Sequence, residues 1–477
     1  MNRLVFLIIF ILVSGVGWSV PRAIAGSKAD TLQPIKTREK LAERVTIRFV
    51  LPVGNKHTRY TIITREMSVR ENDNVLSDSL ETIIDINQKR IFNLSLFTEV
   101  HIAVSRVNDS TIDLIVQVKE QWYIMPEVAL QLADRNFNVW WKEQNRDIRR
   151  ANARITLKHR NFRGYMENLS VTAQIGYTQR FALEYFKPYI DRNQKHGVGG
   201  SISVSKNEET FYITDSNKLE FVKKPGEYII HQYEGALLYT FRPAYASKHL
   251  LELRYRNILI NDTLVQLNPD YFKNGAKEMQ MLQLLYRFEL NRVDNWNYPL
   301  TGTKVVNYIT TRIGFKGFNY QVSDALELGV YKKLGKKWYT GNIFRGRLTT
   351  PEDQPYILRS ALGTGSEYIR GYEYYVIDGS QYGLMRNTLK YEALNVTVRN
   401  IPIKYLSAIP LRIYPKVFVD AGYVTNKFPG NSFLNDRLLY SYGVGIDLVS
   451  AYDFKLRVEY AWNHLGEKGL FLHINSE

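Results

Sequence analysis

The sequence contains no cysteine among its 477 residues. Disulfide bonds, thiolate catalysis and cysteine-based metal sites are therefore excluded. Histidine is scarce, with eight residues, and neither a His-Glu-x-x-His pattern nor a close pair at metal-ligand spacing occurs. Gly-x-Ser-x-Gly and Walker-type phosphate-binding motifs are absent as well. These absences predict a protein that is not an enzyme and that carries neither a metal nor another cofactor.

Long apolar runs are missing beyond the N-terminus. There, Met1-Asn2-Arg3 precedes an apolar run from Leu4 to Val16, and Ala23-Ile24-Ala25 follows. A basic start, a short apolar core and a small-x-small sequence are the pattern of a secretory signal peptide, which we expect at residues 1–25. A signal anchor is the alternative, but about 13 apolar residues are few for a membrane span of about 20.

The chain is basic but has no dense basic runs. Its formal net charge is +16, and removal of a signal peptide that carries Arg3 and Arg22 leaves +14. A basic exterior suits anionic lipid headgroups or nucleic acid. Because lysine and arginine are not clustered, we interpret the charge as a solvated polar surface and expect no nucleic-acid partner.

A small α+β domain is predicted at residues 42–120, after a polar linker at 26–41. The residues 80–94 carry an apolar stripe at helical spacing with one polar interruption, Asn87. The other expected elements are a strand at 45–53, a short helix at 58–67, and two alternating strands at 98–107 and 111–120 joined by a tight turn.

Apolar and polar residues alternate through much of residues 121–477, and no amphipathic helix is evident after Trp122. In "FKLRVEYAW" (454–462), for example, Lys455, Arg457 and Glu459 share the face opposite the apolar residues. Such a charged face suits a wet lumen, and the apolar face suits lipid. A large soluble antiparallel sheet or propeller would show the same alternation. The 33 tyrosines and 22 phenylalanines favour a membrane barrel, which has room for about 16 strands.

The N-terminal domain resembles a POTRA domain. Its strand and helix order is β-α-α-β-β, and Gly54, Asn55 and Thr58 in "GNKHT" match the turn from the first strand to the helix. Phe97 matches the phenylalanine that leads into the second strand. The alternative is an unrelated α+β domain with a Gly-Asn turn.

Three patterns in the second part extend this resemblance. They are "RNFRGYMENL" at 160–169, "RFELNRVDNWNYPLTGTKV" at 287–305, and "SEYIRGYEYY" at 366–375 followed by "TLKYEAL" and "VFVDAGYV". In this order, behind one POTRA-like domain, they resemble the BamA/TamA outer-membrane assembly family, also called the bacterial surface antigen family. The fold expected from the resemblance is mainly β: a small α+β domain followed by a 16-stranded antiparallel transmembrane β-barrel.

The resemblance also implies a site. Ile369, Arg370, Gly371 and Tyr372 match the family's hydrophobic-Arg-Gly-aromatic signature, which lies at the tip of the sixth extracellular loop and folds back into the barrel. Phe418, Asp420 and Gly422 match its Phe-x-Asp-x-Gly strand. A guanidinium binds a carboxylate with two parallel hydrogen bonds, so we expect Asp420, or secondly Glu392, as the partner of Arg370 on the barrel wall. The alternative is an exposed Arg-Gly turn.

The function that the resemblance implies is the assembly, insertion or translocation of other proteins at the bacterial outer membrane. We expect the α+β domain in the periplasm, and outer-membrane lipid, unfolded protein cargo and periplasmic accessory proteins as partners. A passive pore or a lipid-binding barrel is the alternative, since a fold does not fix a function. One departure from the family is the end "GLFLHINSE", where Phe471 precedes Glu477 by six residues. It leaves the pairing of the last strand with the first in doubt.

Overall fold

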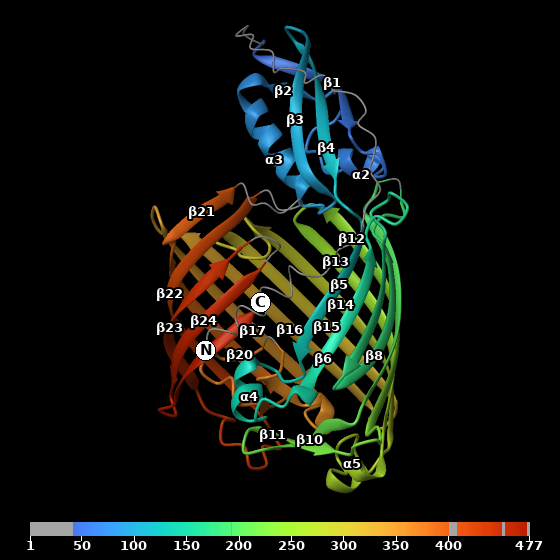
Figure 1. Ribbon diagram of the computed structural model, residues 1–477, viewed down its shortest axis with the longest axis vertical. Coiled ribbons are helices and arrows are strands. Elements are labelled where there is room, and N and C mark those ends of the chain that lie inside the picture. Colours follow the sequence, from blue (N-terminus) through green and yellow to red (C-terminus); the bar gives the residue numbers. More distant parts are fainter. Residues whose placement is uncertain (1–41, 192, 366, 400–407, 451–453, 475–477) are drawn as a thin grey trace.

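The computed structural model describes residues 42–191, 193–365, 367–399, 408–450 and 454–474. The expected signal peptide and linker lie outside these residues. The N-terminal domain contains a four-stranded sheet in the order β2-β1-β4-β3, in which only β1 and β4 run parallel (Figure 1). Its elements are β1 (Arg44–Val53), α2 (Tyr60–Thr64), β2 (Asn74–Leu76), a 3-10 turn (Ser77–Ser79), α3 (Leu80–Phe92), β3 (Phe97–Asn108) and β4 (Thr111–Glu120).

The predicted helical stripe packs on this sheet through α3. Leu80 and Ile91 are buried in the domain core. The polar interruption, Asn87, is also fully buried, and its side chain donates to the Ile83 carbonyl (2.8 Å) and accepts from the Ser68 amide (2.6 Å). Because both polar groups have partners, this asparagine fits the core. The first helix is shorter than predicted, and the three-residue β2 was not predicted.

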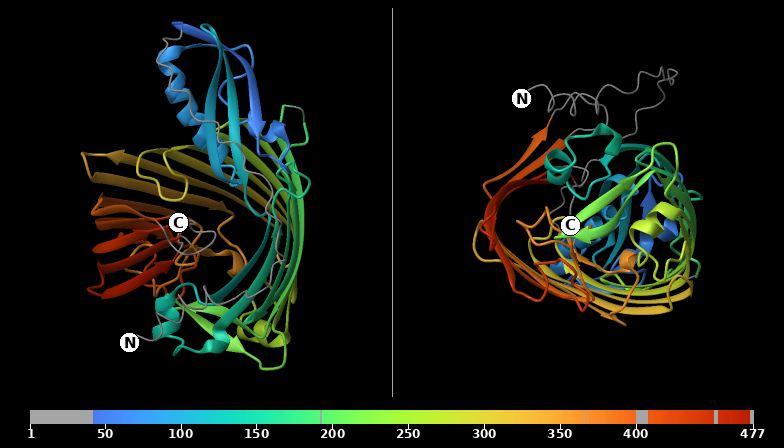
Figure 2. Two further views of the ribbon diagram at one scale, coloured as in Figure 1. Left: turned by 45° about the horizontal axis from the view of Figure 1, so that its top comes forward. Right: turned by 90° about the horizontal axis from the view of Figure 1, so that it is seen from below.

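The second part of the chain is a barrel (Figures 1 and 2). Its strand order closes with β25 next to β5. It contains 17 strand segments, but β20 and β21 pair in succession with β22 and form one interrupted strand, which gives the predicted 16. The segments are β5 (Ile124–Leu132), β6 (Ala151–His159), β7 (Asn168–Gly176), β8 (Thr178–Lys187), β9 (His196–Asn207), β12 (Ile230–Ala244), β13 (Ser247–Ile260), β14 (Glu278–Val293), β15 (Gly302–Lys316), β16 (Tyr320–Lys333), β17 (Trp338–Thr350), β20 (Gln381–Tyr391), β21 (Leu394–Arg399), β22 (Ala408–Thr425), β23 (Leu439–Val449), β24 (Lys455–Asn463) and β25 (Lys468–Ile474).

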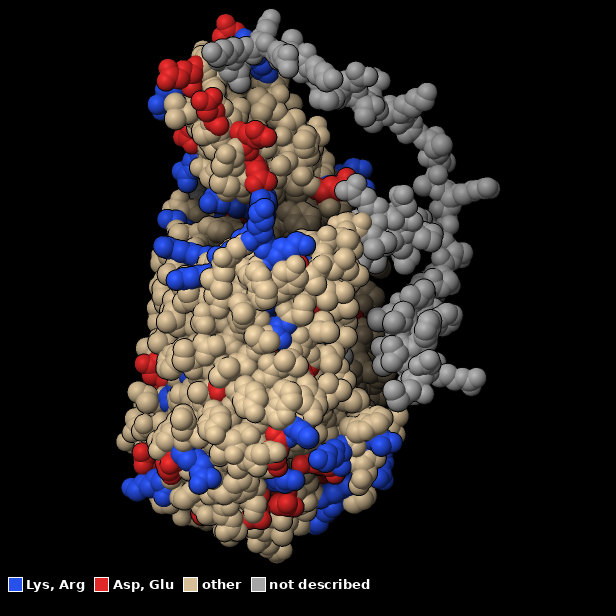
Figure 3. All heavy atoms as spheres, turned by 90° about the vertical axis from the view of Figure 1, so that its left-hand side faces the viewer, with Lys and Arg blue, Asp and Glu red and all other residues tan. Residues whose placement is uncertain are grey.

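The predicted alternation separates the two faces of the wall. Val128 and Leu130 are 71% and 75% exposed on the outside, whereas Lys455 and Glu459 are buried on the inside. Figure 3 shows an outer band with few charges and charged side chains toward both ends of the barrel. This distribution fits an apolar belt that faces lipid. Among the described helices, none is long and apolar enough to cross a membrane.

Longer connections lie at the barrel end away from the N-terminal domain (Figure 1). They contain α4 (Phe137–Lys142), a 3-10 turn (Ile148–Arg150), the hairpin of β10 (Glu209–Asp215) and β11 (Lys218–Lys223), α5 (Asp262–Leu267), a second 3-10 turn (Tyr356–Leu358), β18 (Ser360–Leu362) and β19 (Ile377–Asp378). The sequence predicted no helix in this part. Both α4 and α5 have only six residues, too few to show helical periodicity.

The N-terminal domain is docked on the turn between β6 and β7, which belongs to the motif at 160–169. Asn161 is fully buried there, and its side chain donates to Thr58 Oγ1 (2.9 Å) and accepts from the Met166 amide (2.7 Å). The Arg59 amide donates to the Gly164 carbonyl (2.9 Å). Two motifs that the sequence placed in separate domains therefore meet at the junction.

We expect Asn161→Ala to loosen this junction. Each lost hydrogen bond lowers the local free energy of opening by about 1 kcal/mol, which raises amide exchange several-fold. Hydrogen–deuterium exchange of the residues 57–59 and 160–167 measures this change. Asn93→Ala is the control, because its exposed contact with Tyr245 lies at another turn. Equal exchange in Asn161→Ala and the wild type would contradict the role of Asn161.

Candidate functional site: the loop tip inside the barrel

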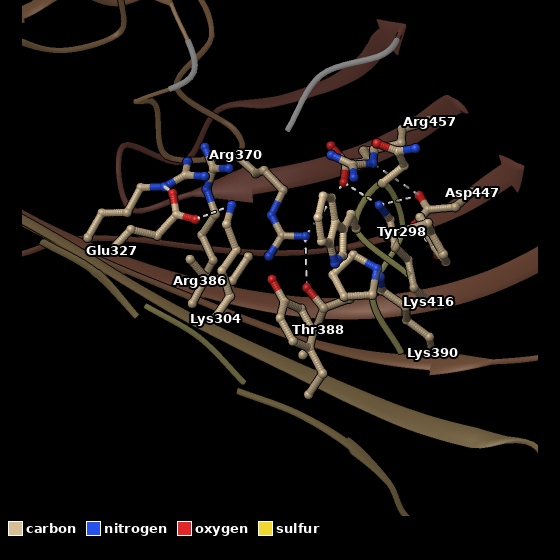
Figure 4. A pocket seen from close by; sticks show the side chains of 18 of the residues that line it. Tyr298, Lys304, Glu327, Arg370, Arg386, Thr388, Lys390, Lys416, Asp447 and Arg457 are labelled. Carbon is tan, nitrogen blue, oxygen red and sulfur yellow. Dashed lines mark hydrogen bonds and ion pairs between the residues drawn. The ribbon is translucent and has the colours of Figure 1, made fainter. Parts of the chain in front are cut away.

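The connection between β17 and β20, residues 351–380, is the sixth loop at the end away from the N-terminal domain. Its tip, residues 369–372, is buried, and Ile369, Arg370 and Tyr372 are 1%, 6% and 2% exposed. Figure 4 shows Arg370 among charged side chains that line an internal cavity. The tip therefore lies within the lumen and is not an exposed turn.

Arg370 contacts two residues of the Phe-x-Asp-x-Gly strand, β22. Its Nε donates to Asp420 Oδ2 (2.8 Å), and Nη2 donates to Oδ1 of the same carboxylate. The guanidinium carbon lies 3.9 Å from the centre of the Phe418 ring. Side-chain exposure is 7% for Arg370 and 0% for Asp420. A charge-assisted pair of this kind is strong because both hydrogen bonds share one rigid guanidinium.

The two glycines of the motifs provide space for the tip. A Cβ at Gly422 would lie 2.5 Å from Ile369 Cδ1, so this strand position accommodates the isoleucine. Gly371 has a φ of +89°, and a Cβ there would lie 3.3 Å from Ala461 Cβ and 3.4 Å from Ser441 Cβ. The φ and the close wall both favour glycine.

Tyr372 fixes the far side of the tip. Its hydroxyl donates to the Tyr440 carbonyl (3.1 Å) and contacts His464 Nδ1, at the ends of β23 and β24. Together the two motifs bring all but one of the predicted site residues into one contact region.

The exception is Glu392. It lies in the break between β20 and β21, where Glu392 Oε2 accepts from the Tyr414 hydroxyl (3.2 Å). The second carboxylate near Arg370 belongs to Glu459 of β24, whose Oε1 lies 3.6 Å from Arg370 Nη1 and 2.7 Å from Lys416 Nζ. Lys416 also contacts Asp447 of β23.

The turn motif at 287–305 reaches the same lumen. Asp294 Oδ1 accepts from the Leu300 and Thr301 amides, both at 3.0 Å, which holds the turn between β14 and β15. The turn projects Tyr298, which is buried, and its hydroxyl donates to Asp447 Oδ2 (2.8 Å) (Figure 4). The predicted barrel motifs therefore make specific contacts, one at the junction with the N-terminal domain and the others inside the lumen.

Glu373 follows the signature and extends the contacts of the tip. The Gly371 amide donates to Glu373 Oε2 (2.7 Å), and the Glu373 carbonyl accepts from Asn136 Nδ2 (2.8 Å) in the first loop. Arg135 Nη2 donates to the Tyr374 carbonyl (2.7 Å). Burial raises the pKa of the Glu373 carboxyl, and the neighbouring His473 opposes this rise.

A side-chain contact lies beside the seam between the first and last strands, where β25 and β5 are neighbours in the closed barrel. The described residues of β25 pair in register with β24, and those of β5 pair in register with β6. At this seam α4 lies against β25: Asn138 Nδ2 donates to the Leu470 carbonyl, and Asn138 Oδ1 accepts from the Leu472 amide (3.3 Å). Its carboxamide thus takes the place that a peptide group of an added strand would have.

Comparison with known families identifies the group to which this barrel belongs. The model of the Omp85 superfamily domain matches residues 161–469. The chain belongs to the Omp85 superfamily. No curated protein sequence matches it.

Solved structures show the same fold at low sequence identity to this Omp85 chain. BamA from Haemophilus ducreyi lacking POTRA domains 1-3 is 18% identical, with 90% of this chain and 84% of that chain covered and a TM-score of 0.53. CdiB from Acinetobacter baumannii is 12% identical, with 91% and 73% covered and a TM-score of 0.51. CdiB from Escherichia coli is 11% identical, with 93% and 92% covered and a TM-score of 0.51.

Proposed function

We propose that this Omp85 chain inserts or translocates other proteins at the bacterial outer membrane. Membership of the superfamily and the likeness to BamA and CdiB support this proposal. In it, the barrel lies in outer-membrane lipid, the POTRA-like domain lies in the periplasm, and unfolded protein is the cargo. Periplasmic accessory proteins deliver that cargo.

The outward edge of β25 carries the proposal. A strand edge offers unpaired N–H and C=O groups, which pair readily with another extended segment. Here two of these groups, the Leu470 carbonyl and the Leu472 amide, are bound by a single side chain of α4. Removing Asn138 from this edge frees both groups at the loss of two hydrogen bonds. A cargo strand joins the barrel there by β-augmentation.

A second edge lies in the N-terminal domain. β3 has 12 residues and is an edge strand, because it is the last strand in the order β2-β1-β4-β3. The helix α3 packs against it. Val104 and Val107 on this strand are 39% and 42% exposed. We assign β3 as the place where cargo first pairs, before it reaches the seam.

We expect that tying α4 to β25 will block insertion. Asn138→Cys and Leu470→Cys, joined by a cleavable bis-maleimide, hold the capping helix on the edge in a chain that has no other cysteine. The measurement is the folding of an unfolded outer-membrane barrel substrate in liposomes that contain the purified protein. Cross-linking should lower the rate about tenfold or more, and cleavage of the linker should restore it.

The control places both cysteines within α4, at Asn138 and Lys142, so that the same reagent leaves β25 free. If the chain tied to β25 inserts the substrate as fast as this control, the seam is not the route. A passive pore makes a different prediction: solute flux through the lumen without any effect on the substrate barrel.

A further inference from the structure

Three side chains from distant parts of the sequence converge beside the loop tip. Glu373 directly follows the tip, Glu459 belongs to β24, and His473 belongs to β25. His473 Nε2 lies 3.4 Å from Glu373 Oε1 and 3.5 Å from Glu459 Oε2, and all three atoms lie within 4.8 Å of one another. The three residues are 3%, 2% and 6% exposed.

The three facing atoms lack hydrogen bonds to any described residue. Each is enclosed, so the lack is not relieved by open solvent. An enclosed polar atom without a partner destabilises the fold, and two carboxylate oxygens facing each other add repulsion. A positive charge between the three atoms, from a bound cation or a shared proton, would relieve both costs.

The opposite atoms of the same groups are held in place. Glu373 Oε2 accepts from the Gly371 amide (2.7 Å), Glu459 Oε1 contacts Lys416 Nζ (2.7 Å), and His473 Nδ1 lies 3.3 Å from the Tyr368 hydroxyl. The Tyr368 and His473 rings also stack, with centroids 5.1 Å apart. An Nδ1–H that donates to Tyr368 leaves the Nε2 lone pair directed at the two carboxylates. Partners of this kind orient metal ligands in known sites.

We propose that Glu373, Glu459 and His473 bind a divalent transition-metal ion, for which Zn²⁺ is the best fit. Zinc takes imidazole nitrogen and carboxylate oxygen at about 2.0–2.2 Å in a tetrahedral arrangement, so neighbouring ligand atoms lie about 3.4 Å apart. The separations of 3.4 and 3.5 Å from His473 Nε2 to the two carboxylate oxygens agree with this edge length. A fourth position remains for water.

The neighbouring cations do not occupy this position. Lys416 Nζ is shared between Glu459 Oε1 and Asp447, and Arg370 is engaged by Asp420. The metal would tie the loop tip to the last two strands, and thus to the edge beside the seam. A metal ion that holds the loop tip against the last strands would also regulate the entry of cargo at the seam. This role rests on the proposed function, whereas the metal site itself does not.

The test is direct metal binding by the full-length protein in detergent. Zn²⁺ is titrated against a chromophoric chelator with the wild type, Glu373→Gln and His473→Ala. His101→Ala, at an exposed histidine of the N-terminal domain, is the control. Heat-modifiable mobility on semi-native gels verifies that each barrel is folded. Glu373→Gln keeps the shape of the side chain and an acceptor for Gly371, so it should fold even if His473→Ala does not.

We expect one bound Zn²⁺ per chain, with the dissociation constant raised about tenfold or more in both ligand variants and unchanged in His101→Ala. Equal affinity in the wild type and Glu373→Gln would overturn the site. So would the absence of Zn²⁺ binding by the wild type. If the unfolding midpoint then depends on pH in the wild type but not in His473→Ala, the three groups share a proton instead of a metal.

Discussion

Arg370→Ala should lower the free energy of unfolding of the barrel by about 3–5 kcal/mol, because the substitution leaves the buried Asp420 carboxylate without its partner. Urea unfolding in detergent, followed by tryptophan fluorescence, measures the loss. Arg370→Lys should recover only part of it, since an ammonium group cannot make the paired hydrogen bonds of a guanidinium.

The double variant Arg370→Ala/Asp420→Ala separates the pair from its surroundings. Removing both charges leaves no unpaired carboxylate, so the double variant should lose less than the sum of the two single variants. Thr388→Val is the matched control, because it removes one weaker contact with Arg370 (3.1 Å) and should cost about 1 kcal/mol. An unchanged urea midpoint in Arg370→Ala would show that the pair does not hold the tip.

Gly422→Val should displace the loop tip from the wall. A Cβ at this position would lie 2.5 Å from Ile369 Cδ1 and 3.4 Å from the Gly383 carbonyl oxygen, so the larger side chain of valine forces Ile369 out of its place. Overpacking of this kind costs about 1–3 kcal/mol. A cysteine in place of Tyr372, a tip residue that is 2% exposed, reports the displacement, because a buried tip reacts slowly with a membrane-impermeant maleimide on intact cells and a displaced tip reacts quickly.

Ile369→Ala in the same chain tests the direction of this effect. The smaller side chain gives the valine room, so the double variant should regain slow labelling at position 372. Gly383→Ala is the control: a Cβ at that glycine, also in the wall, meets nothing within 4 Å. Fast labelling that persists in the double variant would mean that Gly422 does not act through Ile369.

The sequence predicted the fold well because its signals are local. Alternation identified the inward positions of β24, and the turn residues of the N-terminal domain placed most of its strands. The pairing of Arg370 with Asp420 was reachable because each residue lies in a recognisable motif. Glu459 was assigned to the inward face of its strand, but alternation says nothing of height along the barrel, so its place beside Arg370 could not be predicted.

The same limit applies to Glu373, His473 and Asn138. The first two are single residues more than 80 positions apart in the sequence, with no metal-binding spacing between them. Asn138 lies in a six-residue helix that has no periodic pattern. Their roles depend on how loops fold over a closed wall, which is set by tertiary contacts. Glu392 failed as a partner of Arg370 for a related reason: the break after Tyr391 turns it toward Tyr414.

The docking of the N-terminal domain has a mechanical consequence. Its contacts reach the β6–β7 turn through Asn161, the β8–β9 turn through Tyr189, and the end of β12 through the Arg242–Glu66 ion pair (3.0 Å). These strands follow β5 and lie on one flank of the seam (Figure 2). The domain is thus fixed to the leading half of the wall, and a force on the domain acts on the strands next to β5 before it reaches β25.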